Sequence, residues 1–313
     1  MKITRFFKVL IVTALIISFS LCNVAAAGTS YSSIIGGSSE IFLTSSDGKL
    51  FVTTYKSDAL YQINEVTNAK MAANDMYFGL WVLDKSGDVY HYKEDYDTNN
   101  KFADKKKIEK LDKVKSISIG SEGIYALKND GTVWGVGNNL KAFEVKGLKD
   151  VTSISVRDFD VLALKKDGTV WQWRDDALVA DFIKKAALKQ VPGLKNVREI
   201  SAGADSALAL LKDNTVWQWS FSDTKKPVKV TGFTGAKTIE AGRMEAYVVD
   251  GKGEVWTWST INNNSKNAKK IKGLTGITKL AAGGKDSYDG FSSGRLLAID
   301  KNNKIKLIAG EYY

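Results

Sequence analysis

The sequence predicts an all-β protein, a seven-bladed β-propeller built of four-stranded antiparallel blades. The first observation behind this prediction is a hairpin motif that recurs along the chain, with residues 162–173 as its clearest copy. The second is the spacing of the copies, 37 to 50 residues, which is typical of repeats that hold several strands each. The third is composition, since two prolines, frequent glycine and no long apolar stripe of helical period favour short strands throughout.

Each copy of the motif has the pattern of two half-buried strands joined by a tight turn. In residues 162–173, apolar side chains alternate on both sides of a polar break at Asp167-Gly168. A tight hairpin needs a residue at positive φ, which glycine adopts readily and asparagine tolerates. The turn position holds one of these two residues in seven copies: Gly48, Gly87, Gly131, Gly168, Asn214, Gly253 and Asn303. We therefore expect seven hairpins.

A large apolar side chain follows each of the first six turns by three residues. These side chains are Phe51, Tyr90, Trp134, Trp171, Trp217 and Trp256, with Lys306 as the exception in the last copy. A row of tryptophans can stack against sugars, but their regular place in the repeat favours packing between neighbouring blades.

Two further strands complete each repeat. A short strand of small residues precedes the hairpin, as in residues 200–203 and 239–242, and a Val-x-Gly-Leu type strand follows it, as in residues 191–194. Small side chains predict that the first strand lies nearest the axis, where space is least. The last hairpin has no visible fourth strand, so we expect residues 28–33 to help close the ring.

The first 27 residues read as a secretory signal peptide, and residues 28–313 as the propeller. A basic head, an apolar run over residues 9–21 and a small-residue cleavage site at residues 25–27 form this pattern. The apolar run is short for a membrane span, so no span is expected after cleavage. The one cysteine, Cys22, lies in this segment. The predicted location is secreted or associated with the cell wall.

The charge of the chain is strongly positive. The formal net charge is +10, and three of the basic residues lie in the first 27, which leaves +7 for the rest. A basic extracellular protein suits anionic surfaces such as cell-wall polymers, although scattered lysines that keep a strand-rich surface soluble explain the charge more simply. No phosphate-binding loop or base-reading motif is present, so nucleic acid is not an expected partner.

The order of strands resembles the regulator of chromosome condensation repeat, which pairs an Ala-Gly-Gly strand with an Ala-Leu-x-x-Asp-Gly-x-Val-Trp hairpin. Ala202-Gly203, Ala209-Leu210 and the run from Asp213 to Trp217 match it, and the resemblance covers nearly all of residues 31–309. It implies a propeller of the secreted bacterial type, which includes an enzyme inhibitor. The histidine that often follows the glycine pair is absent and Trp-x-Trp replaces Trp-Gly, so the nuclear exchange-factor activity of the family is not implied.

Function is expected on one face of the ring. In a four-stranded antiparallel blade, the loops between strands one and two and between strands three and four share a face, which we call the variable-loop face. The opposite face carries uniform Asp-Gly turns and short Gly-Leu-Lys connections, and we call it the turn face. Packing requires repetition, whereas recognition permits variation, so the variable-loop face is the candidate binding surface.

The inner loops of the variable-loop face combine aromatic and methionine side chains with arginines and carboxylates, the usual mixture of a protein interface. Asp75, Glu122 and Glu245 lie among them. The predicted binding residues are Tyr77, Arg157, Asp158, Phe159, Asp205, Arg243, Met244, Asp286, Tyr288 and Phe291. The predicted function is a secreted, non-enzymatic scaffold that binds an extracellular or cell-surface protein, with inhibition of an extracellular enzyme as one form.

Two alternatives stay open. A carbohydrate-active or lyase-type propeller enzyme could use acids around the central opening, and lysines could attach the protein to an anionic cell-wall polymer. Residues 28–313 contain no cysteine and a single histidine, His91, which alternates with tyrosines on a predicted strand. No catalytic residue, cofactor or metal is therefore predicted.

One segment begins like a calcium-binding loop. Asp95, Asp97 and Asn99 have the spacing of the first three ligands. Asn100 stands in place of the expected glycine and Lys106 in place of the closing glutamate. Calcium binding by this loop stays an open question.

Overall fold

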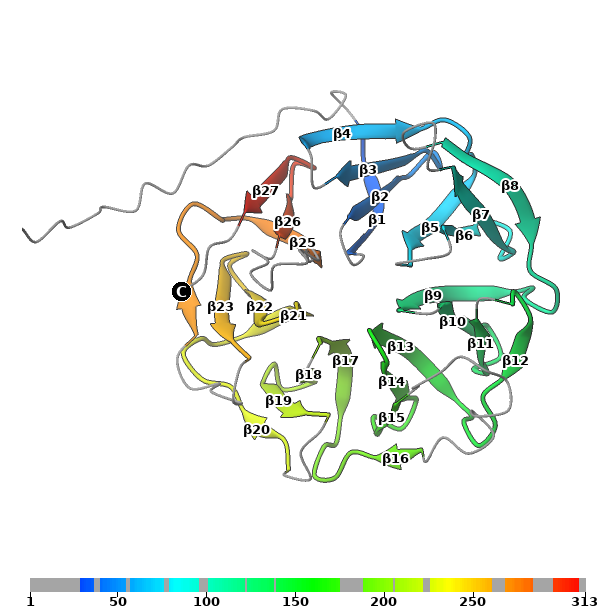
Figure 1. Ribbon diagram of the computed structural model, residues 1–313. Coiled ribbons are helices and arrows are strands. Elements are labelled where there is room, and N and C mark those ends of the chain that lie inside the picture. The colour runs from blue at the N-terminus through cyan, green and yellow to red at the C-terminus, as the bar shows by residue number, and fades with distance from the viewer. Residues whose placement is uncertain are drawn as a thin grey trace, which may run out of the picture.

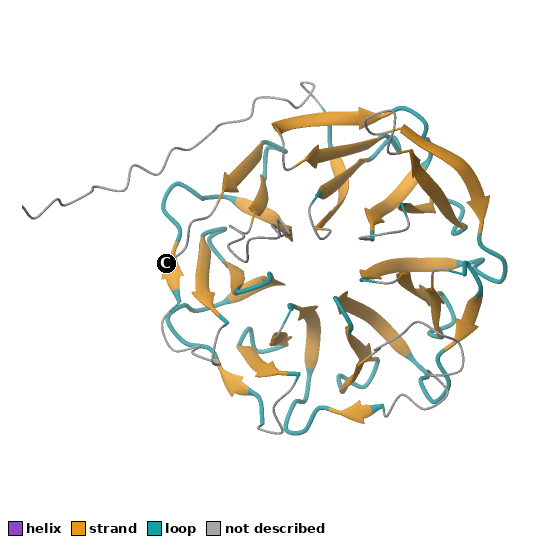
Figure 2. Ribbon diagram, viewed as in Figure 1, coloured by secondary structure: helices purple, strands orange, loops and turns teal. Residues whose placement is uncertain are grey.

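The computed structural model describes residues 29–36, 40–54, 57–75, 79–95, 101–121, 123–137, 139–174, 188–204, 206–221, 226–260, 268–283 and 295–309. These residues form seven antiparallel sheets arranged as blades around a central axis (Figure 1), and the described part contains strands and turns without helices (Figure 2). The predicted all-β, seven-bladed propeller is confirmed.

The strands follow one another from the axis outward in each blade. The first blade consists of β1 (Tyr31–Gly36), β2 (Ile41–Ser45), β3 (Leu50–Thr54) and β4 (Ser57–Ile63). The second consists of β5 (Ala69–Asn74), β6 (Leu80–Asp84), β7 (Val89–Asp95) and β8 (Lys101–Lys107). The third consists of β9 (Val114–Gly120), β10 (Gly123–Lys128), β11 (Val133–Gly137) and β12 (Ala142–Glu144), and the fourth of β13 (Val151–Arg157), β14 (Asp160–Lys165), β15 (Val170–Arg174) and β16 (Lys189–Gln190). The fifth blade consists of β17 (Val197–Ala202), β18 (Ser206–Leu211), β19 (Val216–Ser220) and β20 (Val228–Lys229). The sixth consists of β21 (Ala236–Ala241), β22 (Glu245–Asp250), β23 (Val255–Ser259) and β24 (Lys269–Lys270). The described part of the seventh consists of β25 (Ile277–Gly283), β26 (Arg295–Asp300) and β27 (Ile305–Ala309).

The small-residue strand of each repeat is the innermost one, as predicted. In Figure 1 the strands β1, β5, β9, β13, β17, β21 and β25 surround the central opening. Side chains such as Ala202, Ala241 and Ala282 on these strands are buried, because neighbouring blades approach closely near the axis.

The hairpin turns have the predicted backbone conformation. Every turn residue has a positive φ, at Gly48 (94°), Gly87 (88°), Gly131 (81°), Gly168 (80°), Asn214 (65°), Gly253 (75°) and Asn303 (61°). The turns also join the blades, because the carbonyl oxygen of a turn residue accepts a hydrogen bond from the first residue of the next innermost strand. Ala69 N donates to Gly48 O at 3.0 Å, and Ile277 N donates to Gly253 O at 3.0 Å.

Packing between neighbouring blades forms the core, and the second tryptophan of each Trp-x-Trp pair belongs to it. Trp173, Trp219 and Trp258 are buried. Trp219 Nε1 donates to Gln172 Oε1 at 2.7 Å, and Trp258 Nε1 donates to Gln218 Oε1 at 2.6 Å, each acceptor lying on the preceding blade. The predicted packing role is confirmed for these tryptophans, whereas the first member of each pair is half-buried.

The N-terminal segment closes the ring by packing, not by adding a strand to the last blade. Strand β1 pairs with β2 and completes the first blade, while the described part of the seventh blade has three strands. Tyr31 shares an apolar cluster with Leu297 and Leu307 of the seventh blade. Lys279 Nζ of β25 also donates to the carbonyl oxygens of Tyr31 and Ser32. Of the predicted segment 28–33, Tyr31 and Ser32 thus contribute to closure from within the first blade.

No described segment is a helix with the length and apolarity that crossing a membrane requires. The predicted signal peptide, residues 1–27, lies outside the described residues.

Candidate functional site

The structure describes half of the predicted binding residues. Arg157, Asp158 and Phe159 lie at the turn between β13 and β14, and Arg243 and Met244 lie between β21 and β22. Both turns join a first strand to a second, so both belong to the variable-loop face. Arg243 is exposed and the other four residues are half-buried. The remaining predicted residues lie outside the described part of the chain: Tyr77, Asp205, Asp286, Tyr288 and Phe291.

Phe159 belongs to a packed cluster on the fourth blade. The guanidinium carbon of Arg174, the last residue of β15, lies 5.7 Å from the centre of the Phe159 ring. The same guanidinium pairs with Asp160, with Nη1 and Oδ2 separated by 3.3 Å. Asp160 is only 3% exposed. The buried carboxylate therefore anchors the arginine, which covers the aromatic ring in a cation–π arrangement.

The turn that carries Asp158 is fixed against the third blade. Asp158 has a φ of 50°, a left-handed conformation that aspartate tolerates better than most residues. Its carbonyl oxygen accepts a hydrogen bond from Ser121 N at 2.9 Å. A Cβ added to Gly120 would lie 2.9 Å from this same oxygen, so glycine is needed there for the close approach. The backbone under Arg157 to Phe159 is therefore held in place.

Arg157 reaches across the central channel. It stands where the third, fifth and sixth blades have Gly120, Gly203 and Gly242 at the end of the innermost strand. Its Nη1 donates to the carbonyl oxygen of Ala282 in the seventh blade at 3.3 Å. The fourth and seventh blades are not neighbours in the ring, so this contact spans the opening between them.

A row of side-chain acceptors lines the channel wall. The innermost strands have a free edge toward the axis, and N–H groups on this edge donate to a side chain of the preceding blade. The acceptor and donor pairs are Ser118 with Val156 N (2.9 Å), Ser155 with Ala202 N (2.9 Å), Ser201 with Ala241 N (2.9 Å) and Glu240 with Ala282 N (3.0 Å). Glutamate thus replaces serine at the sixth blade.

Burial raises the pKa of Glu240 to about 7. The hydrogen bond from Ala282 N and the positive charge of Arg157 oppose this rise, and the nearby carboxylate of Glu199 adds to it. Burial also raises the pKa of Glu199, against hydrogen bonds from Ile239 N (3.0 Å) and Thr238 Oγ1 (2.6 Å). The channel therefore holds an arginine beside a carboxyl group that titrates near neutral pH.

The loop at Arg243 and Met244 is fixed by backbone hydrogen bonds. Thr260 N, at the end of the third strand of the same blade, donates to Met244 O at 2.7 Å. Ala204 N of the fifth blade donates to Gly242 O at 3.3 Å. Burial raises the pKa of the adjacent Glu245. Hydrogen bonds from Thr260 and from the fifth blade thus fix the backbone on both sides of the exposed Arg243.

Asp160, Glu240, Arg157 and Arg174 make the side-chain contacts that hold the site, and of these four only Arg157 was predicted from sequence. Asp160, Arg174 and Glu240 were missed, because each acts through a partner on another strand or blade. A signal existed for Glu240, since aligning the repeats places it among three serines. Asp75, expected beside the inner loops, is instead buried and accepts a hydrogen bond from Trp81 Nε1 at 2.6 Å.

The remaining sequence-based candidates fit structural positions or fall outside the described residues. His91 lies on β7, is buried, and packs edge-on against Trp81 with ring centres 4.7 Å apart, as expected for a strand residue. Residues 96–100 of the calcium-like loop lie outside the described part. Within the described residues, no group of three histidine, cysteine or acidic side chains is arranged to hold a metal ion.

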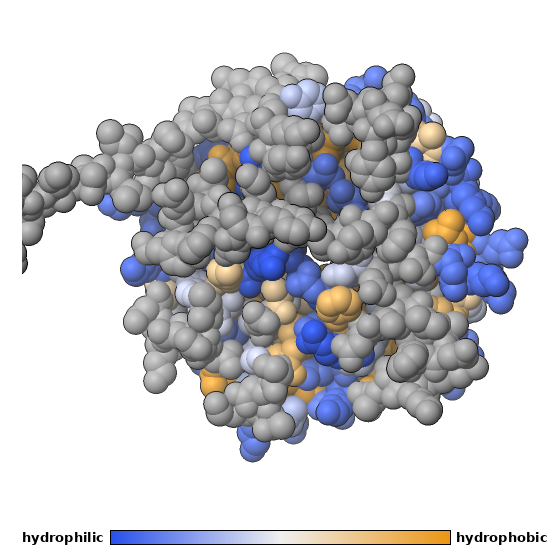
Figure 3. Space-filling model, in the orientation of Figure 1, coloured by the Kyte–Doolittle hydropathy of each residue, from blue (hydrophilic) through white to orange (hydrophobic). Residues whose placement is uncertain are grey.

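The surface around the centre of the ring is chemically mixed. Figure 3 shows hydrophilic and apolar patches of described residues side by side near the centre of the face turned to the viewer. A mixed surface with aromatic and arginine side chains is typical of protein interfaces.

Comparison with known proteins supports the fold. No protein-family model matches the chain, and no curated protein sequence matches it significantly. Many solved structures do match. Human WBSCR16 superimposes with a TM-score of 0.63 at 13% identity, covering 82% of this chain and 86% of that one. Yeast RCC1 (Prp20), solved bound to Kap60, gives 0.56 at 15% identity and covers 74% and 67%. Prp20p of Saccharomyces cerevisiae, described with its binding to Gsp1p and histones, gives 0.54 at 14% and covers 79% and 77%. The neighbours therefore include propellers of the regulator of chromosome condensation type. At identities this low, the similarity is one of fold alone.

Proposed function

We propose that this chain is a non-enzymatic scaffold that binds a protein partner through its variable-loop face. The fourth-blade cluster carries the proposal: Phe159 lies under the Arg174 guanidinium, which the buried Asp160 anchors. Aromatic and arginine side chains dominate the binding energy of protein interfaces. Because these side chains are already ordered by their own contacts, little conformational entropy is lost when a partner binds.

The acids around the channel support a binding role more than a catalytic one. Asp160 pairs with Arg174, and Glu240 accepts a hydrogen bond from Ala282 N. Asp75 accepts one from the Trp81 indole. A general acid or base needs a carboxyl group within reach of substrate, whereas these three stabilise the blades.

The proposed location is outside the cell, because residues 1–27 have the pattern of a signal peptide. The proposed partner is an extracellular or cell-surface protein. A specific form of the proposal is inhibition of an extracellular enzyme, since the chain resembles the secreted β-lactamase inhibitor protein II in its repeat and its signal peptide. Yeast RCC1, a propeller of similar fold, was solved bound to the protein Kap60.

Capture on the immobilised protein tests the proposal. Proteins of the culture medium and cell surface are passed over it, and the affinity of any captured protein is measured by surface plasmon resonance. Replacing Phe159 by alanine should weaken binding by about tenfold or more, the effect of losing a contact worth about 1.4 kcal/mol. Tyr61→Ala is the matched control, because Tyr61 is 45% exposed on the outer strand β4, away from the variable-loop face. Equal binding by the wild-type chain and Phe159→Ala would contradict the proposal.

Adhesion to an anionic cell-wall polymer is a second candidate, and strand β8 favours it. Lys105, Lys106 and Lys107 are exposed on this outermost strand. Two of them have internal contacts, since Lys107 pairs with Asp88 at 2.6 Å and Lys105 lies 4.2 Å from the centre of the Tyr90 ring. Binding that fades steadily as salt rises would favour the polymer, whereas binding through Phe159 should persist.

A carbohydrate-active enzyme is the remaining alternative. Turnover of a polysaccharide that disappears in the Asp158→Asn variant would refute the non-enzymatic proposal. We expect no turnover by either protein.

A further inference from the structure

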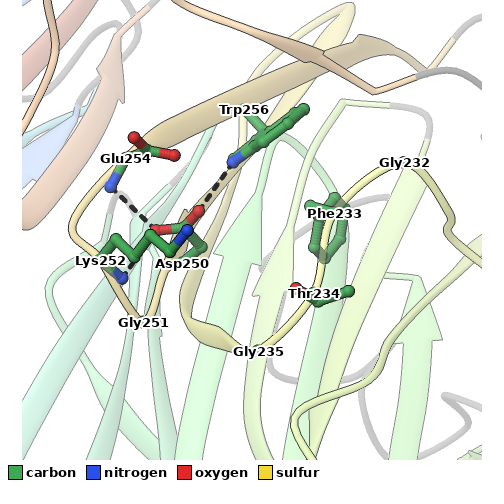
Figure 4. Close-up of a pocket in the computed structure, with 9 residues that line it drawn as sticks. All are labelled: Gly232, Phe233, Thr234, Gly235, Asp250, Gly251, Lys252, Glu254 and Trp256. Atoms are coloured by element: carbon green, nitrogen blue, oxygen red, sulfur yellow. Dashed lines mark hydrogen bonds between the residues drawn. The ribbon is translucent and has the colours of Figure 1, made fainter.

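A hollow of about 560 Å³ lies on the turn face of the sixth blade (Figure 4). One wall is the connection into this blade, residues 232–235, and the other is the hairpin turn from Asp250 to Glu254 with Trp256 behind it. The volume is within the usual range of small-molecule sites. The hollow is on the face opposite the Phe159 cluster, so it requires an explanation of its own.

The hollow opens where the sixth blade departs from the others. In six blades the residue after the second strand donates its N–H to the carbonyl oxygen of the residue before the first strand. These donor and acceptor pairs are Ser46 and Ser30 (2.8 Å), Lys85 and Asn68 (3.0 Å), Asn129 and Lys113 (2.9 Å), Lys166 and Asp150 (2.8 Å), Lys212 and Asn196 (2.9 Å), and Lys301 and Gly276 (2.9 Å). In the sixth blade the two residues are Gly251 and Gly235, and this bond is not among the backbone hydrogen bonds of the described residues. Gly235 and Gly251 are both exposed and both line the hollow.

Phe233 gives the hollow an aromatic wall. Four other connections have a leucine at this position, Leu111, Leu148, Leu194 and Leu274, and each leucine is buried. Phe233 is half-buried and stacks on Trp258, with ring centres 6.0 Å apart and planes at 26°. It is thus more exposed than the leucines, and its ring lines the hollow.

Trp256 forms the opposing aromatic surface, and a buried acid orients it. Its Nε1 donates to Asp250 Oδ2 at 3.0 Å. Asp250 Oδ1 accepts from Lys252 N (2.9 Å) and Glu254 N (3.0 Å), as Figure 4 shows. Burial disfavours ionisation of Asp250, but the hydrogen bonds from Trp256, Glu254 and Lys252 outweigh it and lower its pKa. The carboxylate is therefore charged at neutral pH and holds the indole in place.

The charges around the hollow balance. Asp250 has Lys252 beside it in the turn, and Glu254 pairs with Lys270 at 2.6 Å. A balanced set of charges gives no net attraction for an anion or a cation. Aromatic walls with polar groups at the rim instead suit an uncharged ligand that has both C–H faces and hydroxyl groups.

A second hollow serves as an internal comparison. It lies at the corresponding turn of the fourth blade, has a volume of about 400 Å³, and is lined by Asp150, Lys165, Lys166 and Asp167. A notch at this place therefore occurs in at least two blades. Aromatic walls distinguish the hollow of the sixth blade from this charged one.

We propose that the hollow of the sixth blade binds one pyranose ring of a neutral carbohydrate. Phe233 and Trp256 contact the C–H faces of the ring. The exposed Lys252 side chain and the exposed backbone of Gly235 and Gly251 bond its hydroxyl groups. The site does not depend on the protein-binding proposal, since it lies on the opposite face of the ring, and one molecule can occupy both.

Titration with a defined panel of sugars tests this site on the whole chain. The panel consists of the methyl glycosides of glucose, galactose, mannose and N-acetylglucosamine and their short neutral oligosaccharides. Isothermal titration calorimetry and saturation-transfer NMR measure binding. At least one member should bind with a Kd of about 1 mM or lower, an affinity of about 4 kcal/mol.

Two variants and one control locate the binding. Phe233→Leu installs the residue that four other connections have, so the fold is retained, and it should weaken binding about fivefold by removing aromatic contact. Trp256→Phe should weaken it by a similar factor. Trp217→Phe is the matched control, because Trp217 has the same place in the fifth blade and is half-buried. It should leave the Kd unchanged.

Three results would overturn the proposal. One is the absence of binding by every sugar of the panel at about ten times the expected Kd. The second is a Kd that Phe233→Leu leaves unchanged. The third is tighter binding of a charged probe, such as glucosamine or lysine methyl ester, than of the neutral sugars. None of these results bears on capture of a protein by the variable-loop face, so failure of one proposal is distinguishable from failure of the other.

Discussion

Replacing Glu240 by glutamine should change how the stability of the propeller depends on pH. Glutamine keeps the shape of the side chain and the oxygen that accepts a hydrogen bond from Ala282 N. It removes the ionisable group. The comparison of the two proteins therefore isolates the cost of a charge inside the channel wall.

The magnitude follows from the raised pKa. Burial raises the pKa of Glu240 from 4.5 to about 7, and one pKa unit corresponds to about 1.4 kcal/mol, so ionising the folded protein costs about 3 kcal/mol. Well below pH 4.5 the group is protonated in both folded and unfolded chains and costs nothing. As pH rises from 4.5 through about 7, the unfolded chain ionises Glu240 more readily than the folded chain does, so the free energy of unfolding falls. The fall is complete above about pH 7.

Urea denaturation of the wild-type chain and Glu240→Gln at several pH values measures the effect. The free energy of unfolding of the variant, relative to wild type, should rise by about 3 kcal/mol between pH 4.5 and 8. Asp167→Asn is the control, because hydrogen bonds from Thr169 lower the pKa of Asp167, so its carboxyl group is ionised across this range. A difference between wild type and Glu240→Gln that stays constant with pH would refute the reasoning.

Three further predictions concern the contacts that hold the site. Gly203→Ala should lower the free energy of unfolding by about 2 kcal/mol, because the added Cβ would lie 2.5 Å from a carbonyl oxygen of the sixth blade. Gly251→Ala is the control, because its Cβ has ordinary space, and it should change the free energy of unfolding by less than about 0.5 kcal/mol. Ser201→Ala should cost about 1–2 kcal/mol, since it leaves a buried N–H of β21 without its acceptor. Arg174→Ala should cost about 1–3 kcal/mol by removing the cation that pairs with the buried Asp160. Urea denaturation at neutral pH measures all of these, and a midpoint that Gly203→Ala, Ser201→Ala or Arg174→Ala leaves unchanged would contradict the corresponding prediction.

The regular part of the fold was predictable because it depends on residues that are close together in the sequence of each repeat. Hairpin turns such as Gly168 and Asn214 depend on the conformation of one residue, and the structure gives both a positive φ. The alternation of apolar residues around each turn likewise involves neighbours in sequence. Strand order, blade number and the innermost position of the small-residue strand then followed from the repeat.

The site was less predictable because its contacts join residues far apart in the sequence. Arg157 was recognised as a loop residue, but its reach to Ala282 depends on the diameter of the channel. Arg174 belongs with Phe159 only because β14 and β15 pair in a particular register, which places Arg174 opposite Asp160. Such contacts require coordinates.

Two residues that matter for the sites differ from the residue that other repeats have at the same position. Glu240 stands where three blades have serine, and Phe233 stands where four connections have leucine. Treating the turn face as uniform therefore overlooked the hollow of the sixth blade. Position-by-position comparison of the repeats is the sequence signal that could have revealed both residues.

In the proposed complex the variable-loop face receives the partner. Hydrogen–deuterium exchange of the complex with a captured protein tests it most directly, because the amides covered by the partner exchange more slowly. Binding at the variable-loop face should slow exchange at residues 157–160 and 242–245 and leave the hairpin turns of the opposite face, such as residues 212–215, unchanged. Protection confined to those hairpin turns or to the outer strands would contradict it.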